Sequence, residues 1–141
     1  MAGGITRVEL NRIGSLRFQC MNSEGKSAVI DGPSSMGGED DGVRPMEMIL
    51  MGLAGCSSFD VLNILKKQRL EVQDLKIEVE GKRAETSPSV FTDILVRFIV
   101  KGDVPQTKLD KAIKLSMEKY CSVSHMLSAS VSIHHESVII Q

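Results

Sequence analysis

The stretch from Pro45 to Arg69 reads PMEMILMGLAGCSSFDVLNILKKQR and predicts one long helix at the centre of the fold. Proline is well tolerated in the first turn of a helix, and the basic residues at the far end suit the negative end of the helix dipole. Between Met46 and Cys56 the stretch is apolar on nearly every side, with Glu47 as the exception. A helix that is hydrophobic all round has to be covered, so we expect this half in the middle of the fold or in an oligomer interface.

Alternating apolar residues predict strands before and after this helix. The expected strands are Ile5–Asn11, Ser15–Met21, Ser27–Asp31, Leu75–Arg83, Phe91–Lys101 and about Ser130–Ile140, with a second helix from the Asp103–Pro105 turn to about Tyr120. Strands and helices come in runs rather than in alternation, which predicts an α+β fold without β-α-β units. No repeat or linker interrupts the chain, so we expect a single domain over residues 1–141.

The composition excludes several classes of function. A net charge of −1 and an aromatic content of four Phe, one Tyr and no Trp leave no basic patch or stacking platform for nucleic acid. The most apolar run, Met48–Cys56, is shorter than the ~20 residues of a membrane span, and the N-terminus does not resemble a secretory signal. An odd number of cysteines, three, argues against a disulfide framework. We therefore expect a cytoplasmic protein that binds neither nucleic acid nor membrane.

The three cysteines differ in their surroundings. Cys20 shares a strand face with Leu16 and Phe18, which indicates a small buried hydrophobic residue. Cys56 lies among small residues inside the long helix. If the helix restarts near Gly52–Gly55, Cys56 lies at a new helix N-terminus, where the dipole favours a thiolate. The same small residues would equally allow another backbone to pack closely.

Cys121 follows the second helix and precedes His125 by four residues. A new helical turn beginning at Ser122 would place Cys121 at its N-terminus and both side chains on one face. Two ligands without a C-x-x-C motif do not make a zinc site, so we expect no metal. A Cys–His nucleophile needs an orienting group and an oxyanion hole that the sequence does not identify. The acidic run Glu39-Asp40-Asp41 is expected to be a solvated loop.

Two motifs together resemble a known family. The stretch RPMEMILMGLAGCSSFDVL (Arg44–Leu62) looks like the Pro-x-Glu…Ala-x-Cys central helix of the OsmC/Ohr family of osmotically inducible and organic-hydroperoxide-resistance proteins. The stretch SMEKYCSVSHML (Ser116–Leu127) resembles that family's second cysteine motif. The resemblance covers roughly Ser27 to the C-terminus and points to the YhfA-like branch. It implies an OsmC-like fold with N-terminal antiparallel strands, a buried central helix, a β-hairpin, a second helix and a C-terminal strand, in an intertwined homodimer.

The resemblance also implies a chemistry. Cys56 would attack a hydroperoxide and become a sulfenic acid, and Cys121 would condense with it to a disulfide. A dithiol reductant, lipoylated protein in the better-known members, would restore the pair without a metal or cofactor. Glu47 would support the site, although it comes two residues after Pro45 rather than directly after it. The family's activating arginine belongs to a Gly-Arg turn that this sequence lacks, and the candidates to replace it are Arg12, Arg17 and Arg44.

Two alternatives to a peroxidase remain at this point. The absence of the Gly-Arg turn favours a non-catalytic or weakly active dimer of the same fold whose interface pocket binds a small apolar ligand. A thiol redox sensor would use the same disulfide to change an interaction with a partner.

Overall fold

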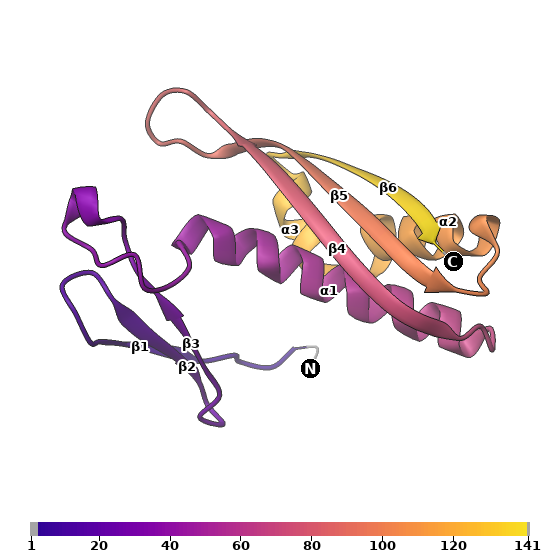
Figure 1. Cartoon of the computed structure of the whole chain (residues 1–141), viewed down its shortest axis with the longest axis horizontal. Coiled ribbons are helices and arrows are strands. Elements are labelled where there is room, and N and C mark those ends of the chain that lie inside the picture. Colours follow the sequence, from indigo (N-terminus) through magenta and orange to yellow (C-terminus); the bar gives the residue numbers. More distant parts are fainter. Residues whose placement is uncertain (1–2, 141) are drawn as a thin grey trace. The chain divides into compact units, whose positions relative to one another are not determined.

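The computed structural model describes residues 3–140 and confirms the α+β class (Figure 1). The chain divides into two compact units between Ile49 and Leu50. Within the described residues, each unit contains a three-stranded sheet. The expectation of a single domain stays a prediction.

The N-terminal unit is an antiparallel sheet followed by a loop and the first turn of a helix. Its elements are β1 (Val8–Arg12), β2 (Phe18–Asn22), β3 (Ser27–Ile30), the 3-10 turn η1 (Ser34–Met36) and the start of α1 (Pro45–Lys67). β2 lies between β1 and β3, as two successive tight connections dictate.

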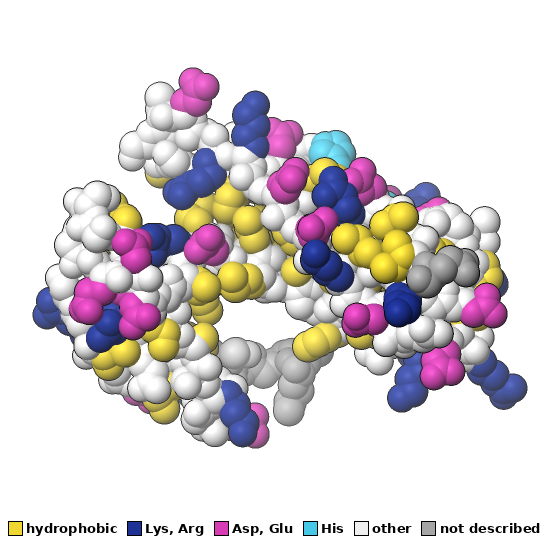
Figure 2. Space-filling view, in the orientation of Figure 1, with side chains coloured by type: hydrophobic (Ala, Val, Ile, Leu, Met, Phe, Trp, Pro, Cys, Tyr) yellow, Lys and Arg dark blue, Asp and Glu magenta, His cyan; other side chains and the backbone are white. Residues whose placement is uncertain are grey.

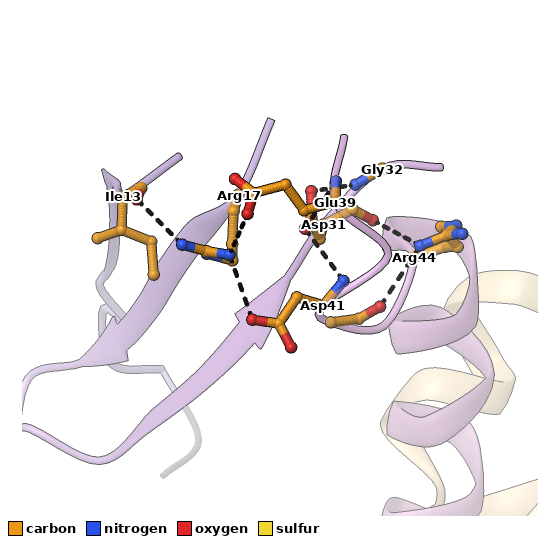
Figure 3. Close-up of polar contacts among 8 residues, drawn as sticks. Ile13, Arg17, Asp31, Gly32, Glu39, Asp41 and Arg44 are labelled. Carbon is orange, nitrogen blue, oxygen red and sulfur yellow. Dashed lines mark hydrogen bonds and ion pairs between the residues drawn. The ribbon is translucent and has the colours of Figure 1, made fainter. Parts of the chain in front are cut away.

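A buried carboxylate organises the loop after β3 (Figure 3). Asp31 accepts backbone hydrogen bonds from Gly32 at 2.7 Å, Glu39 at 3.2 Å and Asp41 at 3.1 Å. Burial acts to raise the pKa of Asp31, but the three N–H groups and the charge of Arg17 outweigh burial and lower it. One side chain therefore fixes the path of the chain from Gly32 to Asp41.

The acidic run Glu39-Asp40-Asp41 lies in a solvent-exposed loop, as the sequence predicted, and arginines pair with each of its members. Arg17 pairs with Glu39 at 3.1 Å and with Asp41 at 3.2 Å, and Arg44 pairs with Asp40. Opposite charges that are distant in sequence neutralise this loop, and local composition does not reveal such pairing.

The C-terminal unit consists of one sheet with helices on one side of it (Figure 1). After α1 come β4 (Val72–Arg83), β5 (Phe91–Gly102), α2 (Gln106–Leu115), the π-helical turn η2 (Ser116–Tyr120), α3 (Ser122–Ser128) and β6 (Ser132–Ile140). The strand order is β4-β5-β6. β4 and β5 form an antiparallel hairpin, whereas β6 runs parallel to β5.

The parallel pairing of β5 and β6 overturns one part of the sequence-based expectation. The chain from β5 through α2, η2 and α3 to β6 is a β-α-β crossover, which the sequence did not predict. Parallel neighbours need a connection of a dozen or more residues, and these helices supply it. The residue pattern of β6 would be the same for a parallel and an antiparallel strand, so it does not predict the direction of β6 relative to β5.

The core of this unit lies between the sheet and α1 and α2. On β5, alternate residues from Ile94 to Val100 are buried, as the period of a strand requires. The helices contribute Leu53, Val61, Leu65, Leu109 and Ile113, which are all fully buried. α1 packs closely against the β4–β5 hairpin at Gly81. A Cβ added to Gly81 of β4 would lie 2.6 Å from the ring of Phe91 in β5 and 3.2 Å from the side chain of Leu50 in α1.

The sequence predicted that the first half of α1 is covered, either in the middle of the fold or in an oligomer interface. Within the single chain this half is not covered on every side. Between Met46 and Cys56 only Leu53 is buried, and Met51 is 53% exposed. By length and composition α1 could also cross a membrane, a test that the core helix of a soluble protein passes as well. The sequence-based count missed this because it ended at Cys56, whereas the apolar character continues to Leu65. Most of this surface is uncovered in the single chain.

Candidate functional site

Cys56 lies in the middle of α1, which runs without a break from Pro45 to Lys67. The helix therefore does not restart near Gly52–Gly55, and Cys56 does not lie at a helix N-terminus. The hydroxyl groups that follow bond back to the helix: Ser57 Oγ donates to the Leu53 carbonyl and Ser58 Oγ to the Gly55 carbonyl, both at 2.8 Å. Cys56 is half-buried and is a free thiol.

Cys121 is placed by an irregular end of the second helical segment. The turn η2 is π-helical, and the Cys121 N–H donates to the carbonyl of Ser116, five residues back, at 2.7 Å. Cys121 then caps α3, and its sulfur accepts a hydrogen bond from the Ser124 N–H at 3.4 Å. The expected new turn at Ser122 is confirmed. Insertions of this π-helical type occur frequently at functional sites.

These elements bring two thiols and one carboxylate together. The sulfur atoms of Cys56 and Cys121 and a carboxylate oxygen of Asp60 all lie within 4.8 Å of one another. A disulfide bond is about 2 Å long, so the two sulfurs would have to approach each other to form one. The tertiary structure thus pairs cysteines from α1 and the start of α3.

The two thiols have different environments. Cys121 is fully buried. This burial raises the pKa of Cys121 to about 11; the Ser124 N–H acts to lower it, and the neighbouring Cys56 acts to raise it further. Cys121 is therefore a neutral thiol at pH 7 and can donate a hydrogen bond to the Cys56 sulfur. Cys56 is the member of the pair that solvent reaches.

Asp60 and Ser116 complete the cluster, and the sequence-based search missed both. Asp60 is four residues after Cys56, which places the two side chains on one face of α1. The buried Ser116 Oγ donates to Asp60 Oδ2 at 3.0 Å and lies 3.3 Å from the Ser57 carbonyl oxygen. The Cys-x-x-x-Asp spacing is the signal that would have indicated Asp60. Nothing local indicates Ser116.

Asp60 also faces an open pocket of about 520 Å³. Polar and apolar side chains line this pocket, among them Asn63, Lys67, Leu115 and Tyr120. The cluster therefore has a route to solvent on the Asp60 side.

Two thiols and a carboxylate are donors that a thiophilic divalent cation such as Zn²⁺ accepts. Structural zinc sites use four protein ligands, and the described residues place three together here. The expectation that the chain holds no metal stays a prediction.

His125 has a partner other than Cys121. Its ring Nε2 lies 3.1 Å from the carbonyl oxygen of Lys119. The backbone N–H of His125 donates to the Cys121 carbonyl, which is a bond of the helical turn. The structure thus gives no support to a Cys–His nucleophile pair.

Glu47 and the candidate arginines have partners within the N-terminal unit. The Glu47 carboxylate accepts the N–H of Arg44 at 2.8 Å, which is one half of a capping box for α1. Arg12 donates to the Ser15 carbonyl at 3.0 Å, and Arg17 and Arg44 hold the acidic loop. The roles of Glu47 and of an activating arginine stay predictions.

Cys20 is half-buried rather than buried, so its predicted place in a core is wrong. It lines an open apolar groove of about 500 Å³ together with Leu10, Ile30 and Met48. Leu10, Cys20 and Ala28 lie opposite one another in β1, β2 and β3, so they share this face of the sheet.

Comparisons with known proteins agree with this architecture. The sequence profile of a family described as OsmC-like protein matches residues 38–136. Protein YhfA of Escherichia coli strain K12 is 39% identical over 126 residues, which cover 89% of this chain and 91% of YhfA. The crystal structure of a hypothetical protein from Aquifex aeolicus VF5 has a TM-score of 0.86 at 35% identity and covers 97% of both chains.

A more distant structure shows the same fold. The organic hydroperoxide resistance protein OhrB of Bacillus subtilis has a TM-score of 0.66 at 20% identity, covering 97% of this chain and 100% of OhrB. At this identity the likeness shows the fold alone.

Proposed function

Because the chain belongs to the OsmC-like family, we propose that it is a thiol-dependent peroxidase that reduces hydroperoxides through Cys56 and Cys121. The observation that carries this proposal is the meeting of the two thiols within 4.8 Å, one half-exposed and one buried. Family membership makes a redox role reasonable, and the pair supplies the groups that this role needs.

Cys56 acts first. Its thiolate attacks one oxygen of the hydroperoxide, the O–O bond breaks, and the leaving alkoxide takes up a proton to become an alcohol. The product at Cys56 is a sulfenic acid. Cys121 cannot take this role, because it is fully buried and is protonated at pH 7. A hydrogen bond donated by the neutral Cys121 thiol to the Cys56 sulfur would stabilise negative charge there before the attack.

Cys121 acts second. Its sulfur attacks the sulfur of the sulfenic acid, the S–O bond breaks, and a disulfide and one water molecule form. A dithiol reductant then reduces the disulfide by thiol–disulfide exchange and is itself oxidised. We propose a lipoylated protein or a comparable dithiol for this step.

We propose organic hydroperoxides as the class of substrate. OhrB is named for organic hydroperoxide resistance, and we extend that class of substrate to this chain. We also propose Glu47 as a supporting residue, with Arg12, Arg17 or Arg44 as the cation that polarises the peroxide.

The exposed apolar surface of α1 supports a homodimer. Phe59 is 70% exposed and Met51 is 53% exposed, and Figure 2 shows hydrophobic side chains on the surface. A single soluble chain rarely exposes a large continuous apolar patch. We propose that a second copy covers α1, that α1 is not a membrane span, and that the protein works in the cytoplasm.

Thiol mapping by mass spectrometry tests the proposal. Reduced protein receives one equivalent of an organic hydroperoxide, with hydrogen peroxide in parallel. We expect a rapid Cys56–Cys121 disulfide, faster with the organic oxidant, and no such disulfide in Cys56→Ser. In Cys121→Ser we expect a sulfenic acid at Cys56 that dimedone traps. Thiols that stay reduced in the wild-type protein would refute the peroxidase.

A second candidate function has one observation in its favour. The apolar groove beside Cys20, about 500 Å³ in volume, has the size of a small-molecule site. A weakly active or non-catalytic protein that binds a small apolar ligand would use it. Retention of an apolar fluorescent probe by wild-type protein, lost in Leu10→Asp, would support this reading.

A redox sensor would form the same disulfide as the proposed peroxidase but would not turn over hydroperoxide. It would form the Cys56–Cys121 bond at a low dose of oxidant and would not consume excess hydroperoxide when a dithiol is supplied. Steady-state peroxide consumption therefore separates the sensor from the enzyme.

A further inference from the structure

We propose that Asp60 is the base that takes the proton from Cys121 when the disulfide forms. This inference deepens the proposed function, since it concerns the second step of the same reaction. It assigns a catalytic role to a residue outside the cysteine pair.

The chemistry of the second step creates the need for a base. A neutral thiol is a poor nucleophile, and Cys121 is neutral at pH 7. Its side chain is fully buried, so bulk water does not reach the sulfur to remove the proton. An acceptor has to come from the protein.

The geometry offers Asp60 for this role. Its carboxylate oxygen lies within 4.8 Å of both sulfurs, close enough for hydrogen bonding after a small side-chain movement. Ser116 donates to Oδ2 and so fixes the carboxylate, while Oδ1 has no hydrogen-bond donor among the described residues. Oδ1 is therefore the oxygen free to accept the proton.

The surroundings of Asp60 suit proton transfer as well. The charged or titratable groups near it are Cys56 and Cys121 in the cluster and Lys67 and Tyr120 along the open pocket. His125, the nearest alternative base in sequence, contacts the carbonyl of Lys119. The pocket gives the carboxylate access to solvent, so the water that forms in this step has a way out.

The step balances without a further reagent. Asp60 accepts the thiol proton, and the Cys121 thiolate attacks the Cys56 sulfur. The S–O bond breaks, and the departing hydroxide takes the proton from Asp60 and leaves as water. The Cys56 sulfur is reduced, the Cys121 sulfur is oxidised, and Asp60 returns to its starting state.

Ellman's reagent tests Asp60 without any peroxide. In a Cys20→Ser background, Cys56 attacks the reagent and releases one thionitrobenzoate, and Cys121 then attacks the mixed disulfide and releases a second. In Asp60→Asn we expect the second release to slow by roughly 10- to 100-fold at pH 7, in line with general-base contributions. The first release should change little. Asparagine can still accept the hydrogen bond from Ser116, so the fold should be kept.

The pH profile separates a base from a structural role. The deficit of Asp60→Asn should shrink as the pH approaches 11, where Cys121 ionises without help. Asp60→Glu should restore part of the rate, and Ser116→Ala should slow it less than Asp60→Asn. The exposed Asp103, changed to Asn, is the matched control and should leave both releases unchanged.

Opposite results would overturn the inference. If Asp60 acted only through its negative charge, its removal would favour the Cys121 thiolate, and the second release would be equal or faster. A slowing that is the same at every pH would also refute a base. A wild-type protein that completes both releases but ignores hydroperoxide would refute the proposed function alone.

Discussion

At the scale of the residue, a difference in burial gives Cys56 and Cys121 different roles in the proposed reaction, although their side chains are chemically identical. Cys56 is open to solvent and Cys121 is closed off from it, so only one of them can meet a hydroperoxide. In the proposed mechanism the buried thiol keeps its proton and acts in the second step, on a sulfur that lies within 4.8 Å of it. A difference in burial thus sets the order of the proposed steps.

The raised pKa of Cys121 predicts a loss of stability in alkali. The unfolded thiol ionises near its ordinary value of 9.0, whereas the folded thiol holds its proton to about pH 11. The Cys121 thiol therefore makes its full contribution to folding stability below pH 9. Between pH 9 and 11 the unfolded state is stabilised, because it releases a proton that the folded state keeps. The free energy of unfolding should fall by on the order of 2 kcal/mol across this window.

Chemical denaturation between pH 8 and 11, under a phosphine reductant, measures this fall. In Cys121→Ala the free energy of unfolding should lack the part of this fall that the Cys121 thiol causes. Cys20→Ala should show the same fall as the wild type. Parallel curves for wild-type protein and Cys121→Ala would contradict the buried, protonated thiol.

At the scale of the element, the N-terminal cap of α1 involves Glu47, which is also a residue of the proposed site. Arg44 is the N-cap, and its carbonyl accepts the Met48 N–H at 3.1 Å. Glu47 bonds back to the Arg44 N–H. A structural role and a proposed catalytic role therefore meet in one carboxylate.

Two substitutions separate these roles of Glu47. Glu47→Ala removes the cap and should cost about 1 kcal/mol of stability. Glu47→Gln keeps a side-chain acceptor for the Arg44 N–H, so stability should stay near that of the wild type. If the charge supports Cys56, peroxide consumption by Glu47→Gln should still fall. Unchanged consumption in a stable Glu47→Gln protein would confine Glu47 to the cap.

At the scale of the whole molecule, the apolar surface of α1 predicts association. We expect wild-type protein to be a dimer by light scattering, and Phe59→Asp to shift it toward the monomer because a charge would enter an apolar interface. Val90 is 52% exposed in the hairpin loop and offers a matched control, since Val90→Asp should leave the dimer intact. A wild-type monomer at all concentrations would refute the association.

The sequence predicted the long helix, the hairpin and most strands, because their signals are local. Hydrophobic periodicity gave the order of the elements, and two motifs identified the family. The sequence also predicted that a new helical turn starts after Cys121, since the pattern of the second helix ends there. The helix limits differed by a few residues: α1 ends at Lys67 rather than Arg69, where the chain turns with a φ of 60°.

The sequence by itself thus determined the α+β class, the family, and Cys56 and Cys121 as the candidate site residues. Only the tertiary structure decided which groups stand beside them. The parallel β6, the π-helical turn before Cys121, the Asp60–Ser116 contact and the burial of Cys121 all depend on residues far apart in the chain. Periodicity describes which face of an element is apolar, whereas the partner of that face is set by packing, and packing also sets the protonation of Cys121.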